Sequence, residues 1–402
     1  MKGSVKKGIF FNKEGAATVW LTVLCQSFRG LSIGGLALLL PLIRKDLGLS
    51  FTQGGSLAAA NTLVYGLMQI PAGYLSDRFS PKRLFVIGVL GSTILALTFG
   101  LVSNYWQALV NQALLGFFRA LLFAPGLALL TGWFPPDRLA TATGLYLIGG
   151  VSGSVIFNLI GPLLVFWFDW RFSFVSISSV GVIAALMLLR FGKDPPLVSG
   201  RRKGSMFEAL HLFRNKIMWV CGGLQYIRLG AMQGITFWLP SLLINEKGLS
   251  LQSAGLVIAL QVIIMSPSNL LGGYLSDRLK NPTLVIGLSL GILGVTTGLL
   301  TAVNHIALLV ALILINAIFL QMYFGPLFSV PIEILGRHKA GISSGFSNFF
   351  ANIGALSVTY LMGAQKDATG TFRPGFFAIS GACFIGLGLT FILARMRHKP
   401  LQ

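Results

Sequence analysis

Long uninterrupted apolar blocks dominate the chain, and short segments between them carry most of the charged residues. The blocks lack the 3.6- or 2-residue period of a half-buried element. Many exceed the ~20 residues that a helix needs to cross the hydrocarbon core of a bilayer. The pattern therefore predicts an all-α membrane protein with twelve transmembrane helices. The predicted spans are 17–43, 54–76, 84–102, 105–131, 140–167, 172–190, 217–243, 253–275, 283–303, 306–330, 340–363 and 374–394.

Composition and charge agree with a membrane protein. Only 10% of the residues are charged, against about 25% in soluble domains. The net charge of +20 could indicate a nucleic-acid partner, but its distribution argues against one. With a cytoplasmic N-terminus, 22 of the 31 Lys and Arg lie on the cytoplasmic side, 6 on the far side and 3 within spans. By the positive-inside rule we predict a multi-pass inner (plasma) membrane protein in the lipid bilayer, with both termini cytoplasmic.

The sequence contains two related halves. Gly73–Arg78 reads Gly-Tyr-Leu-Ser-Asp-Arg and recurs as Gly273–Arg278 at an offset of 200 residues, and Arg29 recurs as Arg228 at an offset of 199. A nearly constant offset over a long stretch indicates an internal duplication. We therefore predict two related six-helix bundles joined by a cytoplasmic linker. The predicted boundaries are 1–190 for the first bundle, 191–216 for the linker and 217–402 for the second bundle.

Three arginines are the only charged side chains in the middle of predicted spans. They are Arg29, Arg119 and Arg228, whereas all 11 Asp and Glu and all 4 His fall in loops or at span ends. An arginine at the centre of a span costs about 2.5–3.5 kcal/mol on insertion scales. Snorkelling to the interface, one alternative, reaches only the ends of a span; pairing with helix carbonyls is another. We expect an anionic substrate as the partner, because the planar guanidinium binds carboxylate or phosphate with two parallel hydrogen bonds.

Polar side chains on the same or neighbouring spans are candidate companions of the arginines in substrate binding. Each of them taken alone fits helix–helix packing better than substrate binding. The three cysteines show no metal-like spacing, so we expect neither a metal nor a cofactor. The candidate companions are Asn61, Tyr65, Asn158, Gln225, Tyr226, Gln261, Tyr323, Asn348 and Asn352.

The stretch Gly73–Arg83, Gly-Tyr-Leu-Ser-Asp-Arg-Phe-Ser-Pro-Lys-Arg, resembles the signature loop between spans 2 and 3 of the major facilitator superfamily. A second copy starts at Gly273, in the matching loop between spans 8 and 9. The resemblance implies a monomer whose two bundles rock around a central site near the bilayer midplane. One position departs from the family, since Gln112 stands where an arginine is common in span 4.

The resemblance also implies that the two signature loops act as gates. Glycine permits close helix contact, an aspartate can face the positive end of a neighbouring helix, and arginines can pair with acids on the cytoplasmic rim. The alternative is that the charges only anchor the topology. The candidate gating residues are Gly73, Asp77, Arg78 and Arg83 in the first loop, and Gly273, Asp277 and Arg278 in the second.

The repeat-related pair Arg29 and Arg228 resembles the central site of organophosphate:phosphate antiporters. Those also use a histidine in span 5, whereas this chain has Asn158 in that helix and no histidine. The stretch from Gly325-Pro326 to Glu333 looks more like organic anion:cation symporters. We predict a secondary active transporter that moves a small organic or phosphorylated anion by exchange, because no acid or histidine within a span can carry protons. The alternatives are efflux of lipophilic drugs and a transporter-fold anion sensor. No nucleophile, metal cluster or phosphate loop indicates an enzyme.

Overall fold

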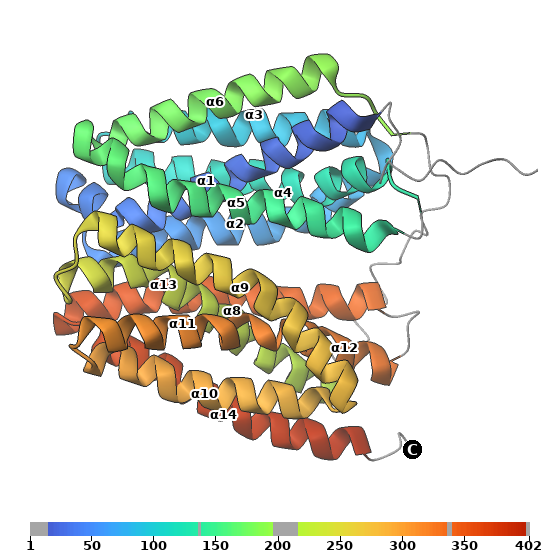
Figure 1. Ribbon diagram of the computed structural model, residues 1–402, viewed down its shortest axis with the longest axis vertical. Coiled ribbons are helices and arrows are strands. Elements are labelled where there is room, and N and C mark those ends of the chain that lie inside the picture. The colour runs from blue at the N-terminus through green and yellow to red at the C-terminus, as the bar shows by residue number, and fades with distance from the viewer. Residues whose placement is uncertain (1–14, 136–137, 196–215, 336–339, 399–402) are drawn as a thin grey trace, which may run out of the picture.

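The computed structural model describes residues 15–135, 138–195, 216–335 and 340–398, and the regular structure in these ranges is helical. The first six helices form an N-terminal group, and the remaining ones form a C-terminal group beside it (Figure 1). The N-terminal group consists of α1 (Ala16–Leu47), α2 (Phe51–Arg78), α3 (Pro81–Phe99), α4 (Tyr105–Thr131), α5 (Leu139–Trp167) and α6 (Trp170–Phe191). The C-terminal group consists of α8 (Lys216–Asn245), α9 (Leu251–Leu279), α10 (Pro282–Ala302), α11 (Ile306–Met322), α12 (Phe324–Leu335), α13 (Ala340–Thr369) and α14 (Arg373–His398).

The internal duplication is visible in how the helices pack. In the N-terminal group α1 lies against α5, and a Cβ on Gly153 of α5 would collide with the carbonyl oxygen of Ser27. In the C-terminal group α8 lies against α13, and a Cβ on Gly354 would collide with the carbonyl oxygen of Tyr226. Nearly the same offset that relates the sequences thus relates two close helix contacts that only glycine allows.

The helices follow the predicted spans with one exception. The predicted span 306–330 is divided into α11 and α12 at Tyr323, whose φ of −96° and ψ of 6° depart from regular helix. Pro326 explains the break, because proline lacks the N–H that would bond the carbonyl of Met322. That carbonyl instead faces Gly272 of α9 so closely that a Cβ there would collide with it.

Ten helical segments in the described ranges are long and apolar enough to cross a membrane. In that count α11 and most of α12 form a single segment, Ile306–Pro331. The helices α2 and α13 are 28 and 30 residues long but are not among the ten. Polar side chains such as Asn61 and Asn352 interrupt their apolar sequence. Most of the predicted linker, residues 196–215, lies outside the described residues.

The two helix groups meet firmly at one end of the molecule, the left end in Figure 1, opposite the C-terminus. We call this the sealed end; it holds the turns 48–50 and 370–372. The ring of Phe51, the first residue of α2, lies 6.0 Å from the ring of Trp238 and 5.4 Å from that of Phe372, centroid to centroid. Because Phe51 belongs to the N-terminal group and the other two rings to the C-terminal group, this aromatic cluster joins the groups.

A carboxylate completes the sealed end. Asp367, in the last turn of α13, accepts hydrogen bonds from the backbone N–H of Phe51 at 2.9 Å and of Thr52 at 2.6 Å. It also accepts one from the hydroxyl of Thr52 at 2.5 Å. The N–H groups in the first turn of a helix have no partner within the helix. One group of helices therefore caps a helix of the other.

Candidate substrate site

Arg119 lies at the centre of a polar cluster between α2 and α4. Its Nη1 donates to Oδ1 of Asn61, and its guanidinium lies 4.9 Å from the ring centroid of Tyr65. The amide nitrogen of Asn61 donates to the backbone oxygen of Gln112 at 3.0 Å and to its side-chain oxygen at 3.4 Å. Gln112, the departure from the family pattern, thus holds Asn61 with its oxygen toward Arg119.

Arg29 lies in the same group of helices as Arg119. Its terminal nitrogen Nη2 is 2.9 Å from the point that a Cβ on Gly150 of α5 would occupy. The guanidinium therefore rests on a part of α5 that has no side chain. Arg29 and Arg119 are within electrostatic range of each other. The Nε atoms of both arginines are buried and have no hydrogen-bond partner among the described residues. The structure thus brings Arg29 and Arg119 together.

Arg228 lies in the C-terminal group and is only 3% exposed. Its Nε donates to Oε1 of Gln225 at 2.7 Å, one helical turn earlier on α8. Its guanidinium lies 4.7 Å from the ring centroid of Phe324 and 5.9 Å from that of Phe328, both on α12. These contacts lie within its own group, so a clamp formed by Arg29 and Arg228 across the two groups stays a prediction.

No carboxylate neutralises the three arginines within the described part of the chain. The ion pairs found there are Arg171 with Asp46 at 2.7 Å and Lys366 with Glu246 at 2.5 Å, in loops and helix ends at the sealed end. The partners of the three arginines are instead amides, aromatic rings and the bare backbone of Gly150. Three cations without an acid can hold an anion.

Several other candidates are buried without a partner in the described ranges. These are Oδ1 of Asn158, both amide atoms of Gln261 and the hydroxyl of Tyr323, which is within electrostatic range of Arg228. Asn158 lies where the two groups touch, because its carbonyl oxygen faces Gly255 of α9. Two further candidates bond within the C-terminal group. Tyr226 pairs its hydroxyl with Ser357 at 2.8 Å, and Asn352 donates to the carbonyl of Asn348 at 2.8 Å.

Gln26 is a further residue that the sequence reasoning missed. It is fully buried on α1, one turn before Arg29, and neither atom of its amide has a partner among the described residues. A neutral amide in a span is not costly enough to stand out as the arginines do. The signal was nevertheless present, because the offset of 199 that relates Arg29 to Arg228 also relates Gln26 to Gln225.

The signature loops lie at the end opposite the sealed end. A Cβ on Gly73 or Gly273 would meet no described heavy atom within 4 Å, so a close helix contact at Gly73 stays a prediction. The guanidinium of Arg78 lies 4.3 Å from the ring centroid of Tyr74 in its own helix. The backbone N–H of Arg83 donates to Ser80. Asp277 and Arg278 are exposed, and the side chain of Asp77 lies outside the described residues.

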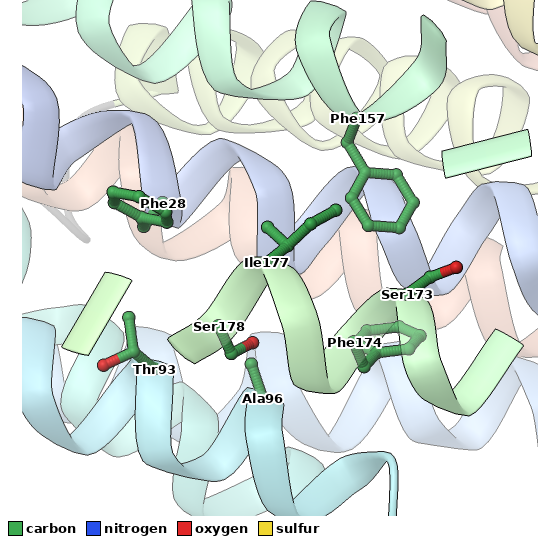
Figure 2. Close-up of a pocket in the computed structure, with 8 residues that line it drawn as sticks. All are labelled: Phe28, Thr93, Ala96, Phe157, Ser173, Phe174, Ile177 and Ser178. Carbon is green, nitrogen blue, oxygen red and sulfur yellow. The ribbon is translucent and has the colours of Figure 1, made fainter. Parts of the chain in front are cut away.

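A small pocket within the N-terminal group does not fit a substrate. Figure 2 shows it between side chains of α1, α3, α5 and α6, with a volume of about 10 Å³, which is room for roughly one water molecule. The hydroxyls of Thr93 and Ser173 in its wall donate to carbonyls of their own helices. None of the candidate residues lines it. The lining residues are Phe28, Thr93, Ala96, Phe157, Ser173, Phe174, Ile177 and Ser178.

Comparison with known proteins places this arrangement in a family. Residues 22–359 match the Major Facilitator Superfamily. The chain is 26% identical over 414 residues to the hexuronate transporter of Bacillus subtilis, covering 97% of each chain. It is 27% identical over 391 residues to the "probable sulfoacetate transporter SauU" of Cupriavidus necator, covering 90% of this chain and 88% of that protein.

A solved structure has the same fold. It is that of a bacterial homologue of the human lysosomal transporter Spinster, in an inward-facing and unoccupied conformation. It matches with a TM-score of 0.83 and 19% identity, over 96% of this chain and 98% of that chain.

Proposed function

Because the chain belongs to the major facilitator superfamily, we propose that it is a secondary active transporter that exchanges one small organic anion for another across the inner membrane. The observation that carries the proposal is the set of three arginines inside the helix groups, none of which has an acidic partner in the described part of the chain. Removing one partner of a buried ion pair is strongly destabilising, so cations in such places need a partner from outside the chain.

The chemistry of arginine favours a carboxylate-bearing substrate. Its planar fork offers parallel N–H groups that match the two oxygens of a carboxylate, and it keeps its charge throughout the transport cycle. Two relatives, the hexuronate transporter and the probable sulfoacetate transporter, are named for anions that carry a carboxylate. A phosphorylated anion fits the same fork. It is the less favoured substrate, because no relative reported above is named for one.

The sealed end supports a direction of access. The positive-inside rule places the turns 48–50 and 370–372 on the outer side and the termini in the cytoplasm. The cluster around Phe51 and the bonds of Asp367 close the outer side, which supports access to the central arginines from the cytoplasm in this conformation. Transport then requires the outer seal to open as the two groups rock around the site.

Exchange follows from the charge of the empty site. No acid or histidine falls in the middle of a predicted span, so no side chain there releases a proton to balance the arginines. Reorienting the empty carrier exposes unpaired cations to a changed, less solvated environment, which is costly. A bound anion neutralises them and lowers that barrier. Return of the carrier is therefore fast only with a second anion bound.

Transport into proteoliposomes tests the proposal. We expect labelled D-glucuronate or sulfoacetate to enter vesicles that contain unlabelled anion and not vesicles without it. Arg29→Lys, Arg119→Lys and Arg228→Lys should each abolish uptake, because a lysine keeps the charge but loses the fork. Arg373→Lys, at an exposed arginine near the sealed end, is the matched control and should leave uptake unchanged.

Two results would contradict the proposal. One is anion uptake that survives all three central substitutions, which would make those arginines structural. The other is transport of neutral or cationic lipophilic compounds with no anion uptake, which would favour drug efflux.

A further inference from the structure

Each half of the chain carries a glutamine three residues before its central arginine. The first copy is Gln26-Ser27-Phe28-Arg29 and the second is Gln225-Tyr226-Ile227-Arg228. On a helix, residues three apart lie on the same face and their side chains can touch. Both glutamines are fully buried, at 0% exposure. The duplication therefore places a buried amide beside an arginine twice.

In the C-terminal group the protein itself satisfies the oxygen of this amide. Oε1 of Gln225 accepts the hydrogen bond from Nε of Arg228 at 2.7 Å. The bond uses the nitrogen that lies within the arginine side chain and leaves the two terminal nitrogens of the fork for other partners. Gln225 thus orients Arg228.

In the N-terminal group the same pair is not bonded. Oε1 and Nε2 of Gln26 and Nε of Arg29 all lack a partner among the residues that the structure describes. Nε2 of Gln26 lies 3.5 Å, and Nη2 of Arg29 lies 2.9 Å, from the same point, the position of a Cβ on Gly150. The amide and the guanidinium therefore come together over the bare backbone of α5. A buried amide with neither hydrogen bond made is destabilising unless a ligand completes it.

The amide oxygen sets the chemistry of that ligand. An ionised carboxylate offers only acceptors, so it can satisfy Arg29 and the NH₂ of Gln26 but not the oxygen of Gln26. The oxygen requires a donor, and a hydroxyl group supplies one. Resting on the proposed anion transport, we propose that Gln26 binds a hydroxyl group of the substrate next to the carboxylate that Arg29 holds. The chain is then selective for hydroxylated carboxylates over anions without a hydroxyl, such as sulfoacetate.

A second arrangement competes with this one. Arg29 could turn its Nε to Gln26, as Arg228 does to Gln225, and Gln26 would then only orient the arginine. The two arrangements differ in one measurable respect. An orienting glutamine affects all anions alike, whereas a glutamine that binds a hydroxyl affects only substrates that carry it.

Competition with two probes that differ in one hydroxyl distinguishes the two arrangements. D-gluconate and 2-deoxy-D-gluconate would each be titrated against labelled D-glucuronate uptake and against the thermal stability of the purified full-length protein. The variants are Gln26→Met and, as the matched control, Gln225→Met, since methionine keeps the length of the side chain without its polar atoms. We expect the wild type to prefer D-gluconate by about tenfold, the effect of one buried hydrogen bond.

The expected pattern is asymmetric between the halves. Gln26→Met should weaken the binding of D-gluconate alone, so that the two probes bind about equally well. Gln225→Met should weaken the binding of both probes equally and keep the ratio of their affinities. An equal loss of both probes in Gln26→Met, or no loss, would overturn the proposal. If the wild type transports sulfoacetate and shows no preference for D-gluconate over 2-deoxy-D-gluconate, the proposed role of Gln26 fails and anion exchange stands. If the wild type transports no anion at all, the proposed function itself fails.

Discussion

Replacement of Asp367 by asparagine should loosen the sealed end. The carboxylate of Asp367 accepts two backbone N–H bonds and one hydroxyl bond from the first turn of α2 in the other group of helices. Ser50 takes the next N–H of that turn, the one of Gln53, at 3.1 Å. The start of α2 is therefore capped partly by its own group and partly by its partner group. An asparagine keeps the shape but loses the charge, and turns an NH₂ toward donors.

The size of the effect follows from these contacts. A hydrogen bond to a charged acceptor contributes about 1.5–3 kcal/mol when buried, but Asp367 is exposed, which brings the value down through solvent screening. The interaction of a carboxylate with a helix N-terminus contributes about 0.3–1 kcal/mol at an exposed position. We therefore expect Asp367→Asn to cost the closed seal about 1–2 kcal/mol. At 1.4 kcal/mol for each factor of ten, this shifts the ratio of closed to open molecules roughly tenfold.

Distance measurement by electron paramagnetic resonance would detect this shift. Spin labels at Leu101 and Ile306, both exposed and one on each group near the sealed end, report the separation of the groups. In Asp367→Asn the longer distance should gain population at the expense of the shorter one. Asp169→Asn, at an exposed acid whose bond from the N–H of Phe172 lies within the N-terminal group, is the control and should leave the distribution unchanged. An identical distribution in wild type and Asp367→Asn would refute the reasoning.

Further predictions concern pH and the central site. Burial raises the pKa of Asp367, which lies beyond the predicted span 340–363, but bonds from Thr52 and Phe51 outweigh it and bring the pKa below its ordinary 3.8. The contribution of Asp367 to the seal is therefore fully present above pH 3.8 and is lost only as pH falls through the lowered pKa, so label distances should not change from about pH 5 to 8. Gly150→Ala should displace Arg29 and raise the half-saturating anion concentration roughly tenfold, whereas Gly144→Ala on the same helix, where a Cβ meets nothing within 4 Å, should not. Asn61→Asp should abolish anion uptake, because it gives Arg119 an internal carboxylate.

The helices and their duplication could be predicted from sequence because both leave a direct pattern. Apolar blocks mark helices that face lipid, and the offset of about 200 residues marks the repeat. The break at Tyr323 was missed because hydropathy is insensitive to backbone hydrogen bonding. Its signal was Gly325-Pro326, which the sequence reasoning used only as a family resemblance.

The candidate site was predictable in its residue types but not in its partners. The cost of a charge inside a span identified Arg29, Arg119 and Arg228 without any structure. That Arg29 lies near Arg119 depends on how α1, α4 and α5 pack, which no local pattern encodes. The sequence did not distinguish Asp367 from the other acids at span ends, because its partners Phe51 and Thr52 are more than 300 residues away in sequence.

The strength of the seal and the chemistry of the central site are linked through exchange. A ligand shifts a conformational equilibrium only by the difference in its affinity for the two states. If the closed seal is favoured about tenfold, an anion must bind the outward-open form about 100-fold more tightly to reverse the ratio, a difference of about 2.7 kcal/mol. A bidentate pair of charge-assisted hydrogen bonds, each of about 1.5–3 kcal/mol and made to Arg228 only when the groups rock, is enough. The contacts of Asp367 are exposed and contribute only modestly to the closed seal, so one anion can offset them, whereas several buried ion pairs in their place would hold the seal shut.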